Sequence, residues 1–311
     1  MRIAVFGAGG VGGYFGGRLA QASEDVIFIA RGAHLQAIRA NGLRVDSLKG
    51  DFRVSPAHAT DDPGQLGEVD AVLVAVKAWQ VPEAAQAIRP MIGPQTCAVP
   101  LGNGVDAPGQ LAAVLGREHV LGGLCQISTF IAGPGWIRHV GLEPKIVFGE
   151  LDGGLSPRVE RLRQAFTRAG VLVDVPADIH AAMWGKFLFI TAVSGVGAVS
   201  RAPIGVTRSL PGTRQLLEQA MQEVLAVAIS RQVRLEEDIV ARTLASIDAM
   251  QPGVIPSMQR DITEGRPSEL EAQTGAVVRL AQEVGIPAPL STWIYHSLLP
   301  QEQRARGKLS F

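Results

Sequence analysis

A glycine-rich segment near the start of the chain has the residue types and spacing to bind a phosphate group. Gly7, Gly9 and Gly12 form G-x-G-x-x-G, directly after the apolar stretch 2–6 and directly before an expected helix over 12–20. The first glycine allows a tight turn, the second lets the backbone approach a pyrophosphate, and the third lets the helix pack closely on the strand. Free N–H groups at the helix start then face the anion. The predicted dinucleotide-binding residues of this loop are Gly7, Ala8, Gly9, Gly10, Val11 and Gly12.

The residue that follows the second expected strand indicates which dinucleotide is bound. In NAD sites an acidic residue ends this strand and hydrogen-bonds the ribose 2′-hydroxyl. Here the apolar stretch 26–30 is followed by Arg31. A guanidinium group attracts the 2′-phosphate of NADP, which a carboxylate would repel. The alternative is a solvated surface arginine, but the position favours the functional interpretation, and we predict that the cofactor is NADPH.

Two more polar side chains follow expected strands. Lys77 comes after the stretch 70–76, and Asn103 comes after the stretch 96–101. Ligands of doubly wound sheets bind beyond the carboxyl ends of the strands. Lys77 is therefore a candidate for a cofactor phosphate or ribose, and Asn103 for the nicotinamide ribose or the substrate. A solvated loop lysine and a turn asparagine are the alternatives, and the residues alone leave both open.

The second half of the chain contains a candidate proton donor. Lys186 lies in an apolar stretch, MWGKFLFITAV, inside an expected helix over 179–200. A lysine ammonium can stabilise the negative charge that a hydride leaves on a carbonyl oxygen, and it can then donate a proton. The alternative is a lysine that extends from a core helix to water. Glu269 and Ser257 stand at expected helix starts, where each can cap a helix. Glu269 can also pair with Lys186 or the nicotinamide ribose, and Ser257 can also bind the substrate carboxylate; these roles do not exclude one another.

The elements that must position these residues change character along the chain. Strand-like and helical stretches alternate in the first half, which predicts an α/β Rossmann-type doubly wound sheet, and an all-α domain follows. Pro176 marks the expected boundary, so we expect an NADP-binding domain over 1–176 and a helical substrate or dimerisation domain over 177–311. The expected strands are 2–6, 26–30, 70–76, 96–101, 119–127, 145–150 and 171–175, with a hairpin that turns at 133–135. The expected helices are 12–20, 82–88, 111–115, 156–169, 179–200, 212–231, 236–250, 258–264, 270–284 and 289–299.

Composition excludes several classes of function. The chain has 29 basic and 29 acidic residues, which argues against a nucleic-acid partner bound through its phosphates. Cys97 and Cys125 form no metal-binding pattern, so we expect reduced thiols, no metal and a cytoplasmic location. The apolar stretch 187–199 is too short to span a bilayer, and we expect no membrane partner.

Several motifs, taken together and in order, resemble the ketopantoate reductase (2-dehydropantoate 2-reductase) family. The motifs are GAGGVG at 7–12, AR at 30–31, VKAWQ at 76–80, GNGV at 102–105, MWGKF at 183–187 and IPSMQRDITEGRPSELE at 255–271. The resemblance covers nearly the whole chain. It implies a Rossmann-type domain joined to a helical domain. It also implies NADPH-dependent reduction of ketopantoate to pantoate, a step of pantothenate biosynthesis.

The resemblance also implies roles for individual residues. The loop at 7–12, Lys77, Asn103 and Glu269 resemble the cofactor contacts of the family, and Lys186 resembles its catalytic lysine. The residues expected near the substrate are Asn103, Lys186, Ile190, Ser194 and Ser257.

The sequence departs from the family pattern in the helix that carries the lysine. The family usually has asparagines four and eight residues after that lysine, where this chain has Ile190 and Ser194. An isoleucine cannot hydrogen-bond a substrate, and a serine has a shorter reach than an asparagine. The alternative substrate is therefore a 2-oxo acid with a more apolar side group.

Two other functions stay open. One is a different reductase on the same plan, for a 3-hydroxy acid or an imine. The other is a protein that senses NADP(H) without turning it over, although a sensor needs no proton donor such as Lys186. The long apolar helices of the second half would suit a homodimer, or equally an internal core.

Overall fold

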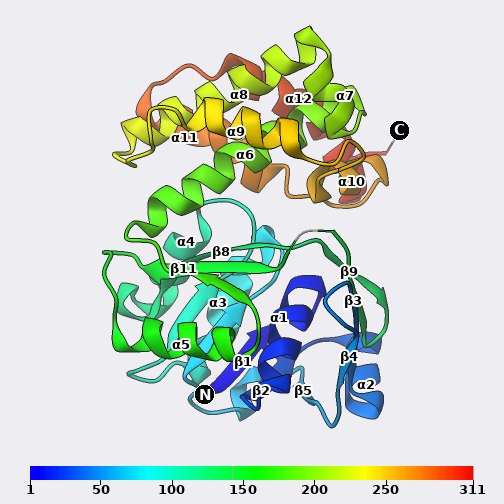
Figure 1. The fold of residues 1–311 in the computed structure, drawn as a ribbon, viewed down its shortest axis with the longest axis vertical. Helices are drawn as coiled ribbons and strands as arrows, with labels where there is room; N and C mark the ends of the chain where they lie inside the picture. Colours follow the sequence, from blue (N-terminus) through cyan, green and yellow to red (C-terminus); the bar gives the residue numbers. More distant parts are fainter. Residues whose placement is uncertain (142, 311) are drawn as a thin grey trace. The chain divides into compact units, whose positions relative to one another are not determined.

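Short apolar stretches in the first third of the chain form a parallel sheet, as a doubly wound fold requires. The computed structural model describes residues 1–141 and 143–310. The strand order is β5-β2-β1-β6-β7, and every neighbouring pair is parallel. Figure 1 labels β1, β2 and β5 of this sheet. The strands are β1 (Arg2–Phe6), β2 (Asp25–Ile29), β5 (His58–Thr60), β6 (Ala71–Val74) and β7 (Cys97–Pro100). All residues of β6 and β7 are buried, which explains why they read as continuous apolar stretches.

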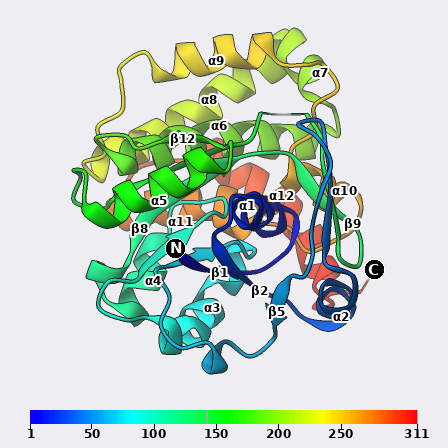
Figure 2. The same ribbon diagram turned by 60° about the horizontal axis from the view of Figure 1, so that its bottom comes forward.

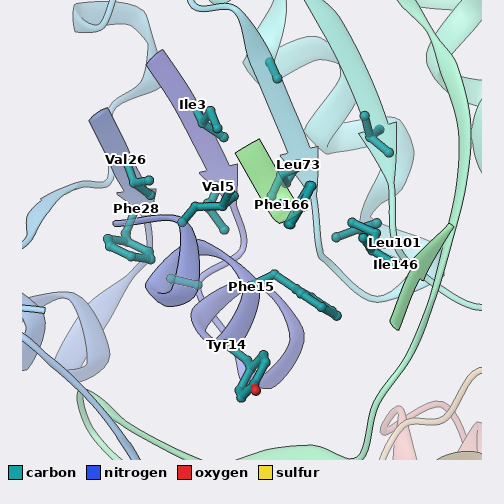
Figure 3. Close-up of a cluster of buried hydrophobic side chains, with 14 of the residues drawn as sticks. Ile3, Val5, Tyr14, Phe15, Val26, Phe28, Leu73, Leu101, Ile146 and Phe166 are labelled. Atoms are coloured by element: carbon teal, nitrogen blue, oxygen red, sulfur yellow. The ribbon is translucent and has the colours of Figure 1, made fainter. Parts of the chain in front are cut away.

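Helices cover this sheet and close its core. The helices of this part are α1 (Gly10–Gln21), α2 (Gly32–Asn41), α3 (Val81–Ile88), α4 (Ala107–Leu115) and α5 (Pro157–Arg168). Figure 3 shows side chains of β1, β2 and β6 together with Phe15 of α1 and Phe166 of α5. The rings of Phe15 and Phe166 meet edge to face, with centroids 6.1 Å apart. Short 3-10 turns cover Pro63–Gln65, Ala78–Gln80, Arg89–Met91 and Arg117–His119.

One expected strand of the main sheet lies elsewhere. β8 (Leu121–Gln126) forms a three-stranded sheet with β11 (Lys145–Glu150) and β12 (Leu172–Asp174), in the order β12-β11-β8. Only an isolated bridge between Ala98 and Val120 continues the parallel pattern from β7. The backbone nevertheless comes close to β7, since a Cβ on Gly123 would lie 2.6 Å from the carbonyl oxygen of Pro100.

A second small sheet was not fully expected. Its order is β4-β3-β10-β9, and the expected hairpin at 133–135 is confirmed as the antiparallel pair β9–β10. Its strands are β3 (Leu43–Ser47), β4 (Phe52–Val54), β9 (Thr129–Gly133) and β10 (Trp136–His139). β3 and β4 escaped prediction because both are short and carry charged residues. α2 also escaped, because only Leu35 and Ile38 of its ten residues are buried.

The rest of the chain is helical, as expected. Its core contains Phe187 and Leu188 of the longest helix, α6, together with Met221 of α8. The elements are α6 (Ile179–Ser200), α7 (Ile204–Ser209), α8 (Pro211–Ser230), α9 (Ile239–Ala249), α10 (Ser257–Thr263), a π-helical turn (Glu271–Gly275), α11 (Ala276–Val284) and α12 (Pro289–Ala305). The helix around the apolar stretch 187–199 is longer than that stretch, and contrary to the expectation α6 is long and apolar enough to cross a membrane by length and composition. However, 67% of its most apolar window is buried in the structure, as in a core helix.

The structure divides into two units, each with its own hydrophobic core. Unit 1 contains residues 1–102 and 106–179, and unit 2 contains residues 103–105 together with the chain from His180 onward. The short segment 103–105 follows β7 but belongs to unit 2, because Val105 packs against the core of that unit. Figure 2 shows the same ribbon from another direction, in which α1 is seen nearly end-on.

Candidate functional site

The glycines of the loop 7–12 have three different surroundings. Gly7 has a φ of +98°, and a Cβ there would lie 2.8 Å from the carbonyl oxygen of Ala75. A Cβ on Gly12 would lie 2.2 Å from the carbonyl oxygen of Gly7, so α1 packs directly on the loop. A Cβ on Gly9 would meet only the Cδ1 atom of Ile131, at 3.9 Å. The loop is therefore closely packed at Gly7 and Gly12 and open at Gly9.

The start of α1 fits an anion at this open position. α1 begins after Gly9 with no side-chain cap and no acidic residue in its first turn, which leaves its N-terminal dipole uncompensated. The buried hydroxyl of Thr129 has no hydrogen-bond partner among the described residues, and a Cβ on Gly10 would lie 2.9 Å from its oxygen. A phosphate oxygen at the open position could accept hydrogen bonds from the free N–H groups of this helix start. No sequence pattern links Thr129 to this loop, because it lies more than a hundred positions away in β9.

Arg31 lies at the end of β2, close to the same loop. The amides of Gly7 and Ala8 both donate to the carbonyl oxygen of Ile29, each at 3.1 Å. Arg31 is the N-cap residue of α2, and its Nη2 donates to Oε1 of Glu83 at 2.8 Å. Both side chains of this ion pair are exposed, at 66% and 63%. The structure therefore places an arginine near the loop, with a carboxylate partner that the sequence did not indicate.

Lys77 follows β6 at the same edge of the sheet. It begins the 3-10 turn Ala78–Gln80, and its amide donates to Oε1 of Gln80 at 3.3 Å. Its Nζ lies 5.9 Å from the centroid of the Trp79 ring, within the range of a cation–π contact. Because β1 lies between β2 and β6, unit 1 brings the loop, Arg31 and Lys77 to neighbouring strand ends.

Unit 2 brings Asn103 and Glu269 together. Nδ2 of Asn103 donates to Oε2 of Glu269 at 2.9 Å, and Glu269 is only 4% exposed. Gly104 has a φ of +99°, and a Cβ there would lie 2.9 Å from the carbonyl oxygen of Ala272. The segment after β7 thus lies against the π-helical turn. Both residues are expected near the cofactor or substrate, and the structure adds a direct hydrogen bond between them.

The backbone beside Glu269 is held by α12. The amide of Ser268 donates to both carboxylate oxygens of Glu302, at 3.1 and 3.0 Å, and its hydroxyl donates to Oε2 at 2.5 Å. Arg306 donates to the same carboxylate at 2.6 Å and to the carbonyl oxygen of Ser268 at 3.0 Å. Ser268 and Glu302 are both buried. These contacts fix the peptide that precedes Glu269.

Lys186 lies on α6, beside the helical core. Trp184 and Phe187 are buried and meet edge to face at 5.5 Å, whereas Lys186 and Ile190 are half-buried. Their spacing of four puts Lys186, Ile190 and Ser194 on one face of the helix. The structure pairs Glu269 with Asn103, and the expected contact between Glu269 and Lys186 stays a prediction.

The far end of this face is closed to solvent, although Ser194 is expected near the substrate. Ser194 is fully buried, and its hydroxyl has no partner among the described residues. The buried hydroxyls of Thr191 and Thr274 likewise have no hydrogen-bond partner among the described residues. Thr274 lies close to α6, since a Cβ on Gly195 would lie 3.4 Å from its Oγ1. Unpartnered buried hydroxyls are rare and call for a polar partner. Ser257 is exposed at the first position of α10, after the N-cap residue Pro256, and its role at the substrate stays a prediction.

Comparisons with known proteins agree with this arrangement. Residues 3–153 match the family described as "Ketopantoate reductase PanE/ApbA", and residues 178–302 match its C-terminal part. A 2-dehydropantoate 2-reductase from Nostoc is 30% identical, over 99% of this chain and 98% of that protein. A crystal structure of a PanE/ApbA family ketopantoate reductase from Ralstonia eutropha is 31% identical, with a TM-score of 0.89, over 98% of this chain and 100% of the other.

A more distant structure shares the fold alone. A D-mandelate dehydrogenase solved with NADH and anilino(oxo)acetate has a TM-score of 0.89 at 21% identity, over 98% of this chain and 100% of the other. The family matches in both halves and the 30% identity along almost the whole chain decide the assignment. The chain belongs to the ketopantoate reductase family of oxidoreductases.

Proposed function

We propose that the protein reduces a 2-oxo acid to a 2-hydroxy acid with NADPH, and that ketopantoate is its substrate. The opening at Gly9 supports this proposal most directly. A pyrophosphate can approach the backbone there because Gly9 has no side chain, and the start of α1 beside it has no side-chain cap. Arg31 at the end of β2 supplies the positive charge that a 2′-phosphate needs. The similarity of this chain to the 2-dehydropantoate 2-reductase from Nostoc, over 98% of that protein, supports ketopantoate as the substrate.

In this proposal the residues of the chain divide the chemistry between them. NADPH supplies a hydride when bound. The loop at 7–12 holds the pyrophosphate, and the hydrogen-bonded pair of Asn103 and Glu269 binds the nicotinamide ribose. The Lys186 ammonium stabilises the charge that develops on the carbonyl oxygen and transfers one proton to it, so that the product is a hydroxyl.

The side chain of Ile190 favours a second candidate substrate. It lies half-buried one helical turn after Lys186, on the same face of α6. An apolar side chain at this point offers nothing to a substrate hydroxyl but packs well against a branched or aromatic group. The alternative function is therefore the reduction of a more apolar 2-oxo acid by the same residues.

A substrate panel tests both candidates. NADPH oxidation is measured with ketopantoate and with its analogue that lacks the 4-hydroxyl, followed by branched and aromatic 2-oxo acids. A higher kcat/KM for ketopantoate than for the deoxy analogue supports the first candidate, and the reverse order supports the second. Tight NADPH binding without turnover of any 2-oxo acid contradicts both and favours a sensing protein.

The role of Lys186 has its own test. Lys186→Ala is expected to lower kcat by about 100-fold or more, because a positioned general acid contributes at least this much. The Kd for NADPH is expected to stay within about twofold, since the phosphate contacts belong to unit 1. Lys308→Ala, which removes an exposed lysine, is the control. Near-normal turnover by Lys186→Ala would end the assignment.

A further inference from the structure

The guanidinium of Arg31, which is expected to bind the 2′-phosphate, already forms an ion pair with a carboxylate. Oε1 of Glu83 accepts a hydrogen bond from Nη2 of Arg31 at 2.8 Å, across 52 positions of the sequence. We propose that Glu83 sets the cofactor preference of this protein, because it competes with the 2′-phosphate of NADPH for the Arg31 guanidinium. The inference rests on the proposed nucleotide site, and it adds a residue that selects between NADPH and NADH.

The backbone around Arg31 suits an anion, but the carboxylate of Glu83 does not. Arg31 is the N-cap residue of α2, whose first turn contains no acidic residue and no side-chain cap. A Cβ on Gly32 would meet nothing within 4 Å, so the start of α2 is open. The exception is Glu83, which comes from the first turn of α3 on the other side of β1.

Glu83 acts on the two nucleotides in opposite directions. A 2′-phosphate carries about two negative charges, so a carboxylate beside it repels NADPH and also holds one of the guanidinium N–H groups. The ribose of NADH has a 2′-hydroxyl instead, which can donate to a carboxylate as it does in NAD sites. The ion pair is exposed and therefore weak enough for a phosphate to displace it. NADPH can still bind, but less tightly than Arg31 alone would allow.

Binding measurements on four proteins test the proposal. Kd values for NADPH, NADH, 2′,5′-ADP and 5′-AMP are measured by calorimetry for the wild type, Glu83→Gln, Arg31→Ala and the double variant. Glu83→Gln is expected to tighten NADPH and 2′,5′-ADP by about three- to tenfold at low salt, and less at high salt where exposed charges are screened. NADH is expected to bind equally well or about twofold more weakly. In the Arg31→Ala background, the effect of Glu83→Gln on NADPH is expected to fall below about twofold.

Glu160→Gln is the matched control. Glu160 also forms an ion pair with an arginine of unit 1, Arg163 on α5, and its loss is expected to change no nucleotide affinity. If Glu83→Gln leaves NADPH affinity unchanged or weaker, the proposal is overturned.

The outcome for the wild type separates this inference from the proposed function. If the wild type prefers NADH and Glu83→Gln tightens NADPH, the inference stands and NADPH as the natural cofactor fails. If the wild type binds no nucleotide, both are overturned.

Discussion

Gly9 and Gly12 differ in what surrounds them, and this difference separates binding from folding. Gly9→Ala adds a methyl group into open space, so the melting temperature is expected to stay within about 2 °C while the Kd for NADPH rises by about tenfold or more. Gly12→Ala places a Cβ against the carbonyl oxygen of Gly7 and is expected to destabilise unit 1 by about 1–3 kcal/mol. Thermal melts and nucleotide titrations of both variants check this. Equal melting temperatures for the two variants would contradict it.

Ile190 offers a direct test of substrate preference. Ile190→Asn introduces a hydrogen-bonding side chain one helical turn after Lys186. We expect kcat/KM for ketopantoate to rise by about three- to tenfold, because a hydroxyl then gains a partner, and kcat/KM for the deoxy analogue to fall. Steady-state rates with both acids measure the change. A parallel fall for both acids would show that position 190 only packs the helix.

Part of the site follows from local spacing and part does not. The turn at Gly7 and the close packing at Gly12 have the geometry that G-x-G-x-x-G predicts. The bond between Asn103 and Glu269 joins residues 166 positions apart, so no local pattern announces it. Glu83 is likewise an ordinary acidic residue of a helix start in the sequence, and only the structure pairs it with Arg31.

At the scale of elements, α12 holds the segment that carries Glu269. Glu302→Ala removes the acceptor of the Ser268 amide and hydroxyl and a partner of Arg306. Because a buried donor loses its acceptor, we expect unit 2 to lose about 2–4 kcal/mol of stability. Glu302→Gln keeps one acceptor oxygen and should lose less. Urea unfolding gives both values, and an unchanged midpoint for Glu302→Ala would contradict the prediction.

Elements with strong apolar patterns were predictable, and weakly patterned ones were not. β1, β6, β7 and the long helix α6 read directly from their apolar residues. The helix expected over 270–284 begins instead with the π-helical turn Glu271–Gly275, which has one more residue per hydrogen-bonded ring than an α-helix. The spacing of apolar residues alone cannot distinguish a π-helical turn from an α-helical turn. The loop segment 103–105 packs beside this turn, and no sequence pattern marks that contact.

At the scale of the whole molecule, stability is expected to depend on a carboxylate in unit 1. Burial opposes the ionisation of Glu150, but hydrogen bonds from Arg158 and Ser156 outweigh it and lower the pKa of Glu150 below its ordinary value. A lowered pKa stabilises the folded state at neutral pH, and this contribution is lost as the pH falls below about 4.5.

Glu150→Gln tests this dependence. Since glutamine does not titrate, the variant is expected to be less stable at neutral pH and to lose less stability than the wild type between about pH 5 and pH 3. Urea unfolding at several pH values measures the slope. Glu218→Gln, which replaces an exposed glutamate, is the control. Identical slopes for Glu150→Gln and the wild type would contradict the prediction.

The division of the chain at segment 103–105 has a consequence for limited proteolysis. The backbone passes between the two units after residues 102, 105 and 179. A protease that cleaves the chain at the last crossing leaves unit 2 in contact with Val105, which packs against the core of that unit. The two fragments should co-elute under native conditions and separate only in denaturant.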